Sequence, residues 1–206
     1  MEFTEVIRRR RMIRGFTTEP LPAGTADRLL EAASRAPSAG FSQGFSFLVL
    51  EGAEQCAPFW RLLYEQAAQA GEAAASEAAQ VDALSAAPLV IVPMASKDVY
   101  LNRYAQPDKA WTAAYGEARW AVPYWYIDTG FATLLILLAV VDAKLGAVFF
   151  GPPDVEDFRA EFGVPPEWMP IGAVAVGYPD PAADPVQPAR PSDRKSLAEL
   201  VHRGRW

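Results

Sequence analysis

Four short apolar runs, each too short to form a buried helix, constrain the fold of this chain more than any other feature of its sequence. Each is rich in β-branched or aromatic residues and is bounded by glycine or proline, which is the pattern of buried strands. These runs are residues 45–51, 88–94, 147–150 and 171–178. Because segments with helical character separate them, we expect an α+β fold in which helices flank a sheet.

The predicted helices lie between these runs. Thr4 is expected to cap a first helix, and Asp154 and Gly163 are expected to begin and end a short late one. Apolar spacing or helical propensity predicts three longer helical segments, the second of them as one peripheral helix or a pair: 22–34, 58–86 and 126–144. The remaining stretch, 96–123, is charged, aromatic and aperiodic, which favours a lid or a substrate loop.

A chain of 206 residues with 51% hydrophobic residues is long enough for one domain, at most two, with a sizeable core. We place the domain at residues 1–178. Residues 179–206 begin with a proline-rich stretch, which cannot donate a regular ladder of backbone hydrogen bonds. We expect them to form an extended arm of the same domain, which in a homodimer would embrace the partner subunit.

Composition argues against several functions. The formal net charge is −6, which does not suit nucleic-acid binding because that usually needs a basic face. Cys56 is the only cysteine, so neither an internal disulfide nor a Cys/His metal site is expected. The longest apolar run, 129–141, is shorter than the roughly 20 residues of a membrane-spanning helix. Arginines stand where a signal peptide would be apolar, so we expect a cytoplasmic protein without a membrane anchor.

Five arginines within seven residues, at positions 8–11 and 14, contrast with this negative charge. They indicate either a bound anion, for which phosphate is the usual candidate, or a solvated basic helix end. Arg10 and Arg14 are four residues apart, so they share one side of a helix or of an extended strand. The chain has neither a GxGxxG nor a P-loop motif, so a nucleotide phosphate would have to be held by other means.

Four stretches of the chain, in order, resemble motifs of the nitroreductase family of FMN-dependent oxidoreductases. RRRRMIRGF at 8–16 is similar to the family's Arg-Arg-Ser-x-Arg-x-Phe opening, and APSAGFSQGF at 36–45 is similar to its Ala-Pro-Ser-x-x-Asn-x-Gln-Pro-Trp. Residues 127–151 resemble the family's central helix and the Gly-Leu-Gly strand that follows it. The last strand and basic tail of the family are matched by 171–179 and 194–201.

The resemblance implies that the chain binds FMN between the two subunits of a homodimer. The implied cofactor-binding residues are Arg10, Arg11, Met12, Arg14, Pro37, Ser38, Ala39, Phe41, Gln43, Phe149, Phe150, Gly151 and Arg194. Arg10 and Arg14 would contact the phosphate and the ring, and Arg194 would return to the phosphate. Residues 37–43 would reach the flavin bound by the opposite subunit, and the two late phenylalanines would flank the ring.

The implied fold is a nitroreductase-like three-layer sandwich, in which helices flank a central, mainly antiparallel sheet and the C-terminal arm embraces the dimer partner. The implied reaction is reduction of a nitroaromatic, quinone or other conjugated acceptor with NADH or NADPH, by a ping-pong hydride-transfer mechanism. Because the flavin carries the chemistry, no catalytic side chain is required and no metal is expected. Two alternatives stay open. One is a flavin-dependent dehydrogenase or oxidase that desaturates a specialised metabolite or peptide, and the other is a flavin-binding or interaction protein without redox turnover.

The chain departs from the family's pattern at three positions. Met12 replaces a serine, Phe41 replaces an asparagine, and Gly44 replaces a proline. The first two changes remove polar groups near the flavin. We therefore expect a more apolar ring environment, which can alter the redox poise of the cofactor because protein groups tune its electronics.

The aromatic residues between positions 100 and 125 either pack together or stack on a small planar substrate. If they stack on a substrate, the candidate residues are Tyr104, Trp111 and Trp120. The single histidine, His202, lies in the tail beside Arg203 and Arg205, which favours a surface or dimer-contact role over acid–base chemistry.

Overall fold

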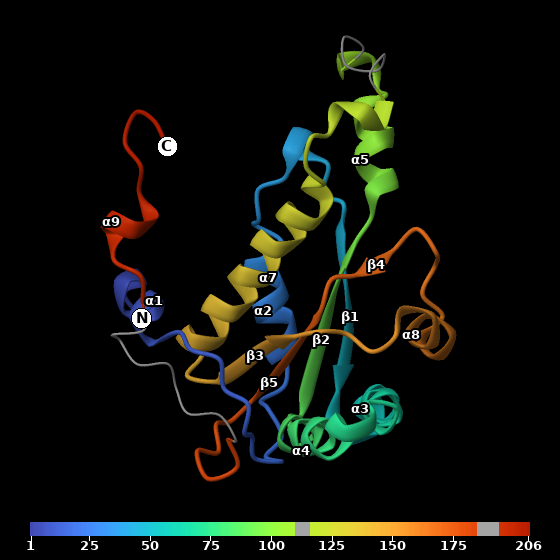
Figure 1. Ribbon diagram of the computed structural model, residues 1–206, viewed down its shortest axis with the longest axis vertical. Helices are drawn as coiled ribbons and strands as arrows, with labels where there is room; N and C mark the ends of the chain where they lie inside the picture. The colour runs from blue at the N-terminus through green and yellow to red at the C-terminus, as the bar shows by residue number, and fades with distance from the viewer. Residues whose placement is uncertain (110–115, 185–193) are drawn as a thin grey trace.

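The computed structural model describes residues 1–109, 116–184 and 194–206, and its strands are interspersed with helices along the chain (Figure 1). The helices are α1 (Phe3–Arg9), α2 (Thr25–Ala33), α3 (Gly52–Ala68), α4 (Ala74–Ser85), α5 (Lys97–Tyr104), α7 (Tyr124–Asp142), α8 (Val155–Phe162) and α9 (Leu197–Leu200). Short 3₁₀ turns occur at η1 (Ala39–Phe41), η2 (Gly71–Ala73), η3 (Pro107–Lys109) and η4 (Gly116–Arg119). The strands are β1 (Phe45–Glu51), β2 (Leu89–Ala95), β3 (Gly146–Phe150), β4 (Met169–Pro170) and β5 (Ala173–Gly177).

The strands form one sheet in the order β1-β2-β5-β3, and every pairing is antiparallel. β1 pairs with β2 along its whole length, from Phe45 opposite Ala95 to Glu51 opposite Leu89. The two-residue strand β4 pairs with the end of β2, on which Ala95 lies opposite Met169. All four predicted apolar runs are strands of this sheet, whereas β4 is too short to give a sequence signal.

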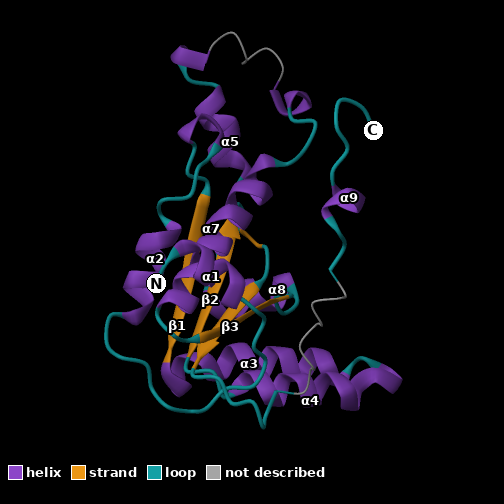
Figure 2. Cartoon of the chain, turned by 90° about the vertical axis from the view of Figure 1, so that its left-hand side faces the viewer, coloured by secondary structure: helices purple, strands orange, loops and turns teal. Residues whose placement is uncertain are grey.

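Helices cover both faces of the sheet, as Figures 1 and 2 show. One core lies under α2 and α7, and the other lies under α3, α4 and α8. Strand β5 contributes to both, because Val174 and Val176 belong to the first core while Ala173 and Ala175 belong to the second, and all four are fully buried. With both faces covered, the strand is apolar at every position. The structure therefore confirms the predicted three-layer α+β sandwich.

The central helix α7 packs one side against α2 and the sheet, where Ile136 and Val140 are fully buried. Over an 18-residue window of its 19 residues the mean hydropathy is 1.7, enough by length and composition to cross a membrane, yet 44% of that window is buried inside the protein. Core helices of globular proteins have the same composition. The opposite side exposes apolar side chains at helical spacing, which we call the α7 face: Tyr124, Ile127, Phe131 and Leu134.

Several helix ends differ from those predicted. The prediction that Thr4 caps α1 is wrong, because the helix begins at Phe3 and no side chain caps it. The second helix begins at Thr25 and not at Pro22, since Gly24 has a left-handed φ of 72° that precedes the first turn. The late helix α8 is confirmed. Asp154 accepts hydrogen bonds from two of its first backbone N–H groups, and Gly163 ends it at a φ of 63°.

The chain beyond β5 crosses the N-terminal segment closely. Phe16 forms a β-bridge with Pro179, and the N–H of Asp180 donates to the carbonyl of Gly15. A Cβ at Gly15 would lie 2.3 Å from the backbone nitrogen of Asp184, so only glycine fits under the crossing. Figure 2 shows α9 standing apart from the body, and the apolar side chains of this helix and of the tail after it stay uncovered in the single chain: Leu197, Leu200, Val201 and Trp206.

Candidate functional site

A basic cavity of about 220 Å³ lies where the end of α1, the end of α7 and the start of β3 meet. Helix α1 ends at Arg9, and the chain continues in an extended form in which the N–H of Ile13 donates to the carbonyl of Ala147 on β3. This hydrogen bond places the arginine cluster beside the sheet. Four basic residues line the cavity, Arg9, Arg10, Arg11 and Lys144, and its apolar walls include Ile13, Leu137, Val141 and Leu145.

The five arginines fall into groups with different surroundings. Arg8 and Arg9 both pair with Glu5 on α1, and hydrogen bonds from these two guanidinium groups lower the pKa of the Glu5 carboxyl to about 2. Both side chains are exposed. Arg10 and Arg11 line the cavity and form no ion pair with any other described residue. Their charge therefore remains available for an anion.

Lys144 is a cavity residue that the sequence analysis did not single out. It follows the last turn of α7 and has a left-handed φ of 61°, which is uncommon for a residue with a side chain. A cation just beyond a helix C-terminus also suits the helix dipole. The sequence shows only that this lysine stands between the predicted helix and a glycine-bounded strand. The fold brings it to Arg10 and Arg11, which are more than 130 residues earlier in the chain.

Arg14 and Met12 of the N-terminal motif do not line the cavity. The backbone N–H of Arg14 donates to Asp184, 3.0 Å away, within the crossing of the C-terminal segment. Met12 is partly buried and packs against both hydrophobic cores, so its side chain has a packing role in place of a hydroxyl. Arg194 lies on the arm and does not line the cavity of its own chain. Its predicted return to a phosphate remains a prediction.

Residues 37–43 form a tight loop with an unusual backbone. Gly40, Phe41 and Gln43 have φ values of 62°, 53° and 52°, although only the first is a glycine. The N–H of Gln43 donates to the hydroxyl of Ser38 at 3.0 Å, and Phe41 is 74% exposed. Left-handed residues with side chains persist only where their surroundings hold them, and such strain gathers at functional sites. Pro37 and Gln43 are also exposed, so the loop presents its side chains outward.

A buried hydrogen-bonded group holds this loop from inside. The carboxylate of Asp128 on α7 accepts the N–H of Ala39 at 2.8 Å and the hydroxyl of Tyr100 at 2.7 Å. Asp128 is 3% exposed and Tyr100 is fully buried. Burial, together with the hydrogen bond to Asp128, raises the pKa of the Tyr100 phenol far above its usual range, so this donor stays protonated. Three elements, α5, α7 and the loop, therefore meet at one carboxylate.

Gly44 is explained by the same tyrosine. A Cβ at position 44 would lie 2.4 Å from the Tyr100 ring, so the phenol occupies the space that a side chain at this position would need. We expect Gly44→Ala to lower the free energy of unfolding by about 1–3 kcal/mol, as overpacking does in cores. Urea unfolding measures the loss. Because the closest clash is with the Tyr100 ring, the losses of Gly44→Ala and Tyr100→Ala should add to more than the loss of the double variant. Strict additivity would contradict this explanation.

The two phenylalanines of β3 point to opposite faces of the sheet, as successive strand residues must. Phe149 packs with the core under α7, whereas Phe150 packs with the other core and stacks on Trp60 at a centroid distance of 6.1 Å. Gly151, directly after the strand, is exposed. Therefore only Phe149 lies on the same side of the sheet as α7. The predicted contact of both rings with a flavin remains a prediction.

The aromatic residues around α5 pack on one another. The ring of Trp120 lies 4.9 Å from that of Tyr104 and 5.9 Å from that of Tyr100, in edge-to-face geometry. Trp120 also contacts Tyr124 and Trp125. These contacts establish packing for Trp120 and Tyr104, and a substrate role for either remains a prediction. Trp111 lies outside the described residues.

A second cavity, of about 580 Å³, lies between α3, α4 and the segment at Thr18 and Pro20. Its one basic lining residue, Arg61, already pairs with Glu65 and Glu161. The positive charge of Arg61 is therefore already neutralised by carboxylates. The first cavity is the better site for an anion. Among the described residues, no group of His, Cys, Asp or Glu is arranged to hold a metal ion.

An antiparallel α+β sandwich with a basic cavity beside its outer strand β3 defines a recognisable class of protein. The sequence pattern of the nitroreductase family matches residues 7–178. A protein of Thermus thermophilus named NADH dehydrogenase is 32% identical over 203 residues, which cover 94% of this chain and 91% of that protein. The chain therefore belongs to the nitroreductase family, a family of oxidoreductases.

Solved structures agree with this fold. A nitroreductase family protein from Clostridium difficile 630 superposes with a TM-score of 0.71 at 21% identity, over 100% of both chains. A putative nitroreductase from Exiguobacterium sibiricum, in complex with FMN, gives a TM-score of 0.70 at 18% identity, over 98% of this chain and 97% of that one. At such identities the likeness concerns the fold alone.

Proposed function

We propose that this protein is an FMN-dependent oxidoreductase that takes electrons from NADH or NADPH and passes them to a small planar acceptor, such as a nitroaromatic, a quinone or another conjugated compound. The observation that carries the proposal is the basic cavity beside β3. Arg10, Arg11 and Lys144 bring three cations to an apolar pocket in a protein whose overall charge is negative. When bound, FMN supplies the hydride chemistry, and NAD(P)H and the acceptor react in turn.

The residues of the cavity fit a flavin phosphate. Two guanidinium groups can pair with its oxygens by charge-assisted hydrogen bonds, and the Lys144 ammonium adds a third positive charge. Apolar side chains form part of the walls, and charged contacts are stronger where such groups replace water. The FMN-bound relative and the relative named NADH dehydrogenase support the choice of cofactor and of electron donor.

A homodimer would complete this site. The α7 face carries four exposed apolar residues, and exposed apolar patches of this kind mark interaction surfaces. The arm carries four more at its end, Leu197, Leu200, Val201 and Trp206. Burial of both against a second copy would remove this surface from water. The loop 37–43 would then lie at the flavin of the opposite subunit, and the arm would bring Arg194 to a phosphate. We place the protein in the cytoplasm, where a lone buried thiol such as Cys56 stays reduced.

The proposal is tested by the visible absorption spectrum of the purified protein and then by reduction of the bound flavin. We expect the purified protein to be yellow, or to become so with added FMN, and to unfold at a higher temperature when FMN is present. Under anaerobic conditions, NADH or NADPH should bleach the bound flavin in stopped-flow measurements, and a nitroaromatic or quinone should restore the colour.

Two results would contradict the proposal in different ways. A colourless protein that FMN does not stabilise on heating would refute cofactor binding altogether. A yellow protein that neither NADH nor NADPH bleaches would retain the cofactor but refute the reductase direction, in favour of a dehydrogenase or oxidase that takes electrons from another substrate.

A further inference from the structure

One face of the helix α5 packs against the loop 37–43. Tyr100, Arg103 and Tyr104 have the spacing of residues that share a helix face. The ring of Tyr100 fills the space beside Gly44, and the ring of Tyr104 does the same at Gly40, where a Cβ would lie 2.7 Å from it. Arg103 lies between them and donates from Nε to the carbonyl of Gly40 at 2.9 Å. One helical face therefore contacts Gly40 of the loop and Gly44, the residue that directly follows the loop.

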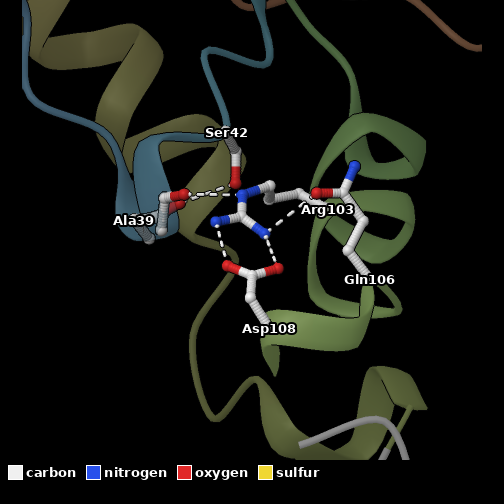
Figure 3. Close-up of polar contacts among 6 residues, drawn as sticks. Ala39, Ser42, Arg103, Gln106 and Asp108 are labelled. Atoms are coloured by element: carbon white, nitrogen blue, oxygen red, sulfur yellow. Dashed lines mark hydrogen bonds and ion pairs between the residues drawn. The ribbon is translucent and has the colours of Figure 1, made fainter. Parts of the chain in front are cut away.

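Asp108 fixes the orientation of the Arg103 guanidinium (Figure 3). The two terminal nitrogens of Arg103 donate to the two carboxylate oxygens of Asp108 at 2.8 and 2.7 Å, and one of them also donates to Gln106. This bidentate pairing uses the end of the planar fork and leaves the Nε–H directed at Gly40. The hydrogen bonds from Arg103 lower the pKa of the Asp108 carboxyl, so the pair is charged at neutral pH.

The loop depends on such outside contacts because its own conformation is strained. Hydrogen bonds within it run from the Phe41 N–H to Ser38 and from the Ser42 hydroxyl to Ala39. They close the turn, but the left-handed φ values of Phe41 and Gln43 remain unfavourable for residues with side chains. The anchors from outside are Asp128 at Ala39 and Arg103 at Gly40. Between them they determine where Phe41 stands.

We propose that Arg103 and Asp108 form a clamp that holds the loop 37–43 in this conformation and so positions Phe41 at the flavin site of the second copy. Arg103 is then a positioning residue, and Phe41 is the side chain whose placement decides which acceptors fit. Asp108 belongs to η3, in the segment that follows α5. The Arg103 guanidinium therefore connects the position of that segment with the position of the loop. The part of the inference that concerns the flavin rests on the proposed function.

The clamp itself can be tested without any cofactor. In Asp108→Asn and Arg103→Lys, we expect the backbone amides of Phe41, Ser42 and Gln43 to exchange with deuterium about fivefold faster, since a partly exposed ion pair contributes modestly to local stability. Arg103→Lys keeps the charge but loses the fork. The matched control is Lys97→Gln, which breaks the Lys97–Glu117 pair on the same helix, a pair that involves no residue of the loop. Hydrogen exchange of the full chain, read by mass spectrometry, measures the rates.

The second measurement concerns the cofactor. We expect the same two variants to weaken FMN binding about fivefold by fluorescence titration and to change the visible circular dichroism of the bound flavin, with Lys97→Gln unchanged in both. Unchanged exchange in Asp108→Asn and Arg103→Lys would overturn the clamp. Faster exchange with unaltered FMN affinity and dichroism would overturn its positioning role. If the unmodified protein binds no FMN, the proposed function fails, and the exchange rates still decide whether the clamp exists.

Discussion

Arg10→Ala is expected to weaken FMN binding by about ten- to 150-fold, because a hydrogen bond between charged groups contributes roughly 1.5–3 kcal/mol. Arg10 lines the basic cavity and has no ion pair with another described residue, so its guanidinium is available to a phosphate. Titration of the apo-protein with FMN, followed by quenching of flavin fluorescence, measures the change. Arg194→Ala should also lower the affinity, if the arm brings this residue to the phosphate.

The matched control for Arg10 is Arg8→Ala. Arg8 belongs to the same cluster and carries the same charge, but it pairs with Glu5, is 73% exposed and does not line the cavity. Its removal should change the affinity less than about twofold at physiological salt, where exposed charges are screened beyond about 8 Å. Equal losses in both variants would mean that general positive charge, and not the cavity, attracts the cofactor. If Arg10→Ala leaves the affinity for FMN unchanged, Arg10 does not bind the phosphate.

Asp128→Ala is expected to lower the free energy of unfolding by about 2–5 kcal/mol. It leaves a buried donor, the hydroxyl of Tyr100, and a partly buried one, the N–H of Ala39, without an acceptor, and each such loss costs about 1–3 kcal/mol. Asp128→Asn should cost less, because its amide oxygen still accepts at the same place. Urea unfolding at a fixed protein concentration, followed by circular dichroism, measures both variants.

Asp142→Ala provides the control on the same helix. This carboxylate lies at the other end of α7, is 54% exposed and pairs only with the N-terminal amine among the described groups, so its loss should cost less than about 1 kcal/mol. If Asp128→Ala and Asp142→Ala unfold at the same urea concentration, the buried carboxylate does not organise the loop as we describe.

Much of the architecture was predictable because burial leaves a direct mark on sequence. The run from 45 to 51 is β1 with the same bounds, and the run from 171 to 178 contains β5. The segment 58–86, predicted as one helix or a pair, forms the two helices α3 and α4, although α3 begins six residues earlier, at Gly52. The segment 96–123 was predicted as a loop because α5 combines charged and aromatic residues without an apolar stripe, and only tertiary packing stabilises that helix.

The candidate site was predictable only in part, since a binding site is an arrangement of distant residues. The motif at 8–16 identified Arg10, Arg11 and Arg14. The first two line the basic cavity and Arg14 does not, whereas Arg9, which the motif did not select and which pairs with Glu5, lines it as well. Lys144 carried no motif signal. Gly44 was seen as a departure from the family's pattern, and its reason, the ring of Tyr100, lies 56 residues later in the chain.

The sequence by itself determined the fold class, the family and the presence of a cationic cluster, because apolar spacing, ordered motifs and charge are properties of neighbouring residues. Tertiary structure alone decided which cations meet in one cavity, that Phe149 and Phe150 face opposite cores, and that Asp128 and Arg103 hold the loop with Phe41. The physical reason is that these features depend on contacts between residues far apart in the chain, which the packing of α5 and α7 around the sheet brings together.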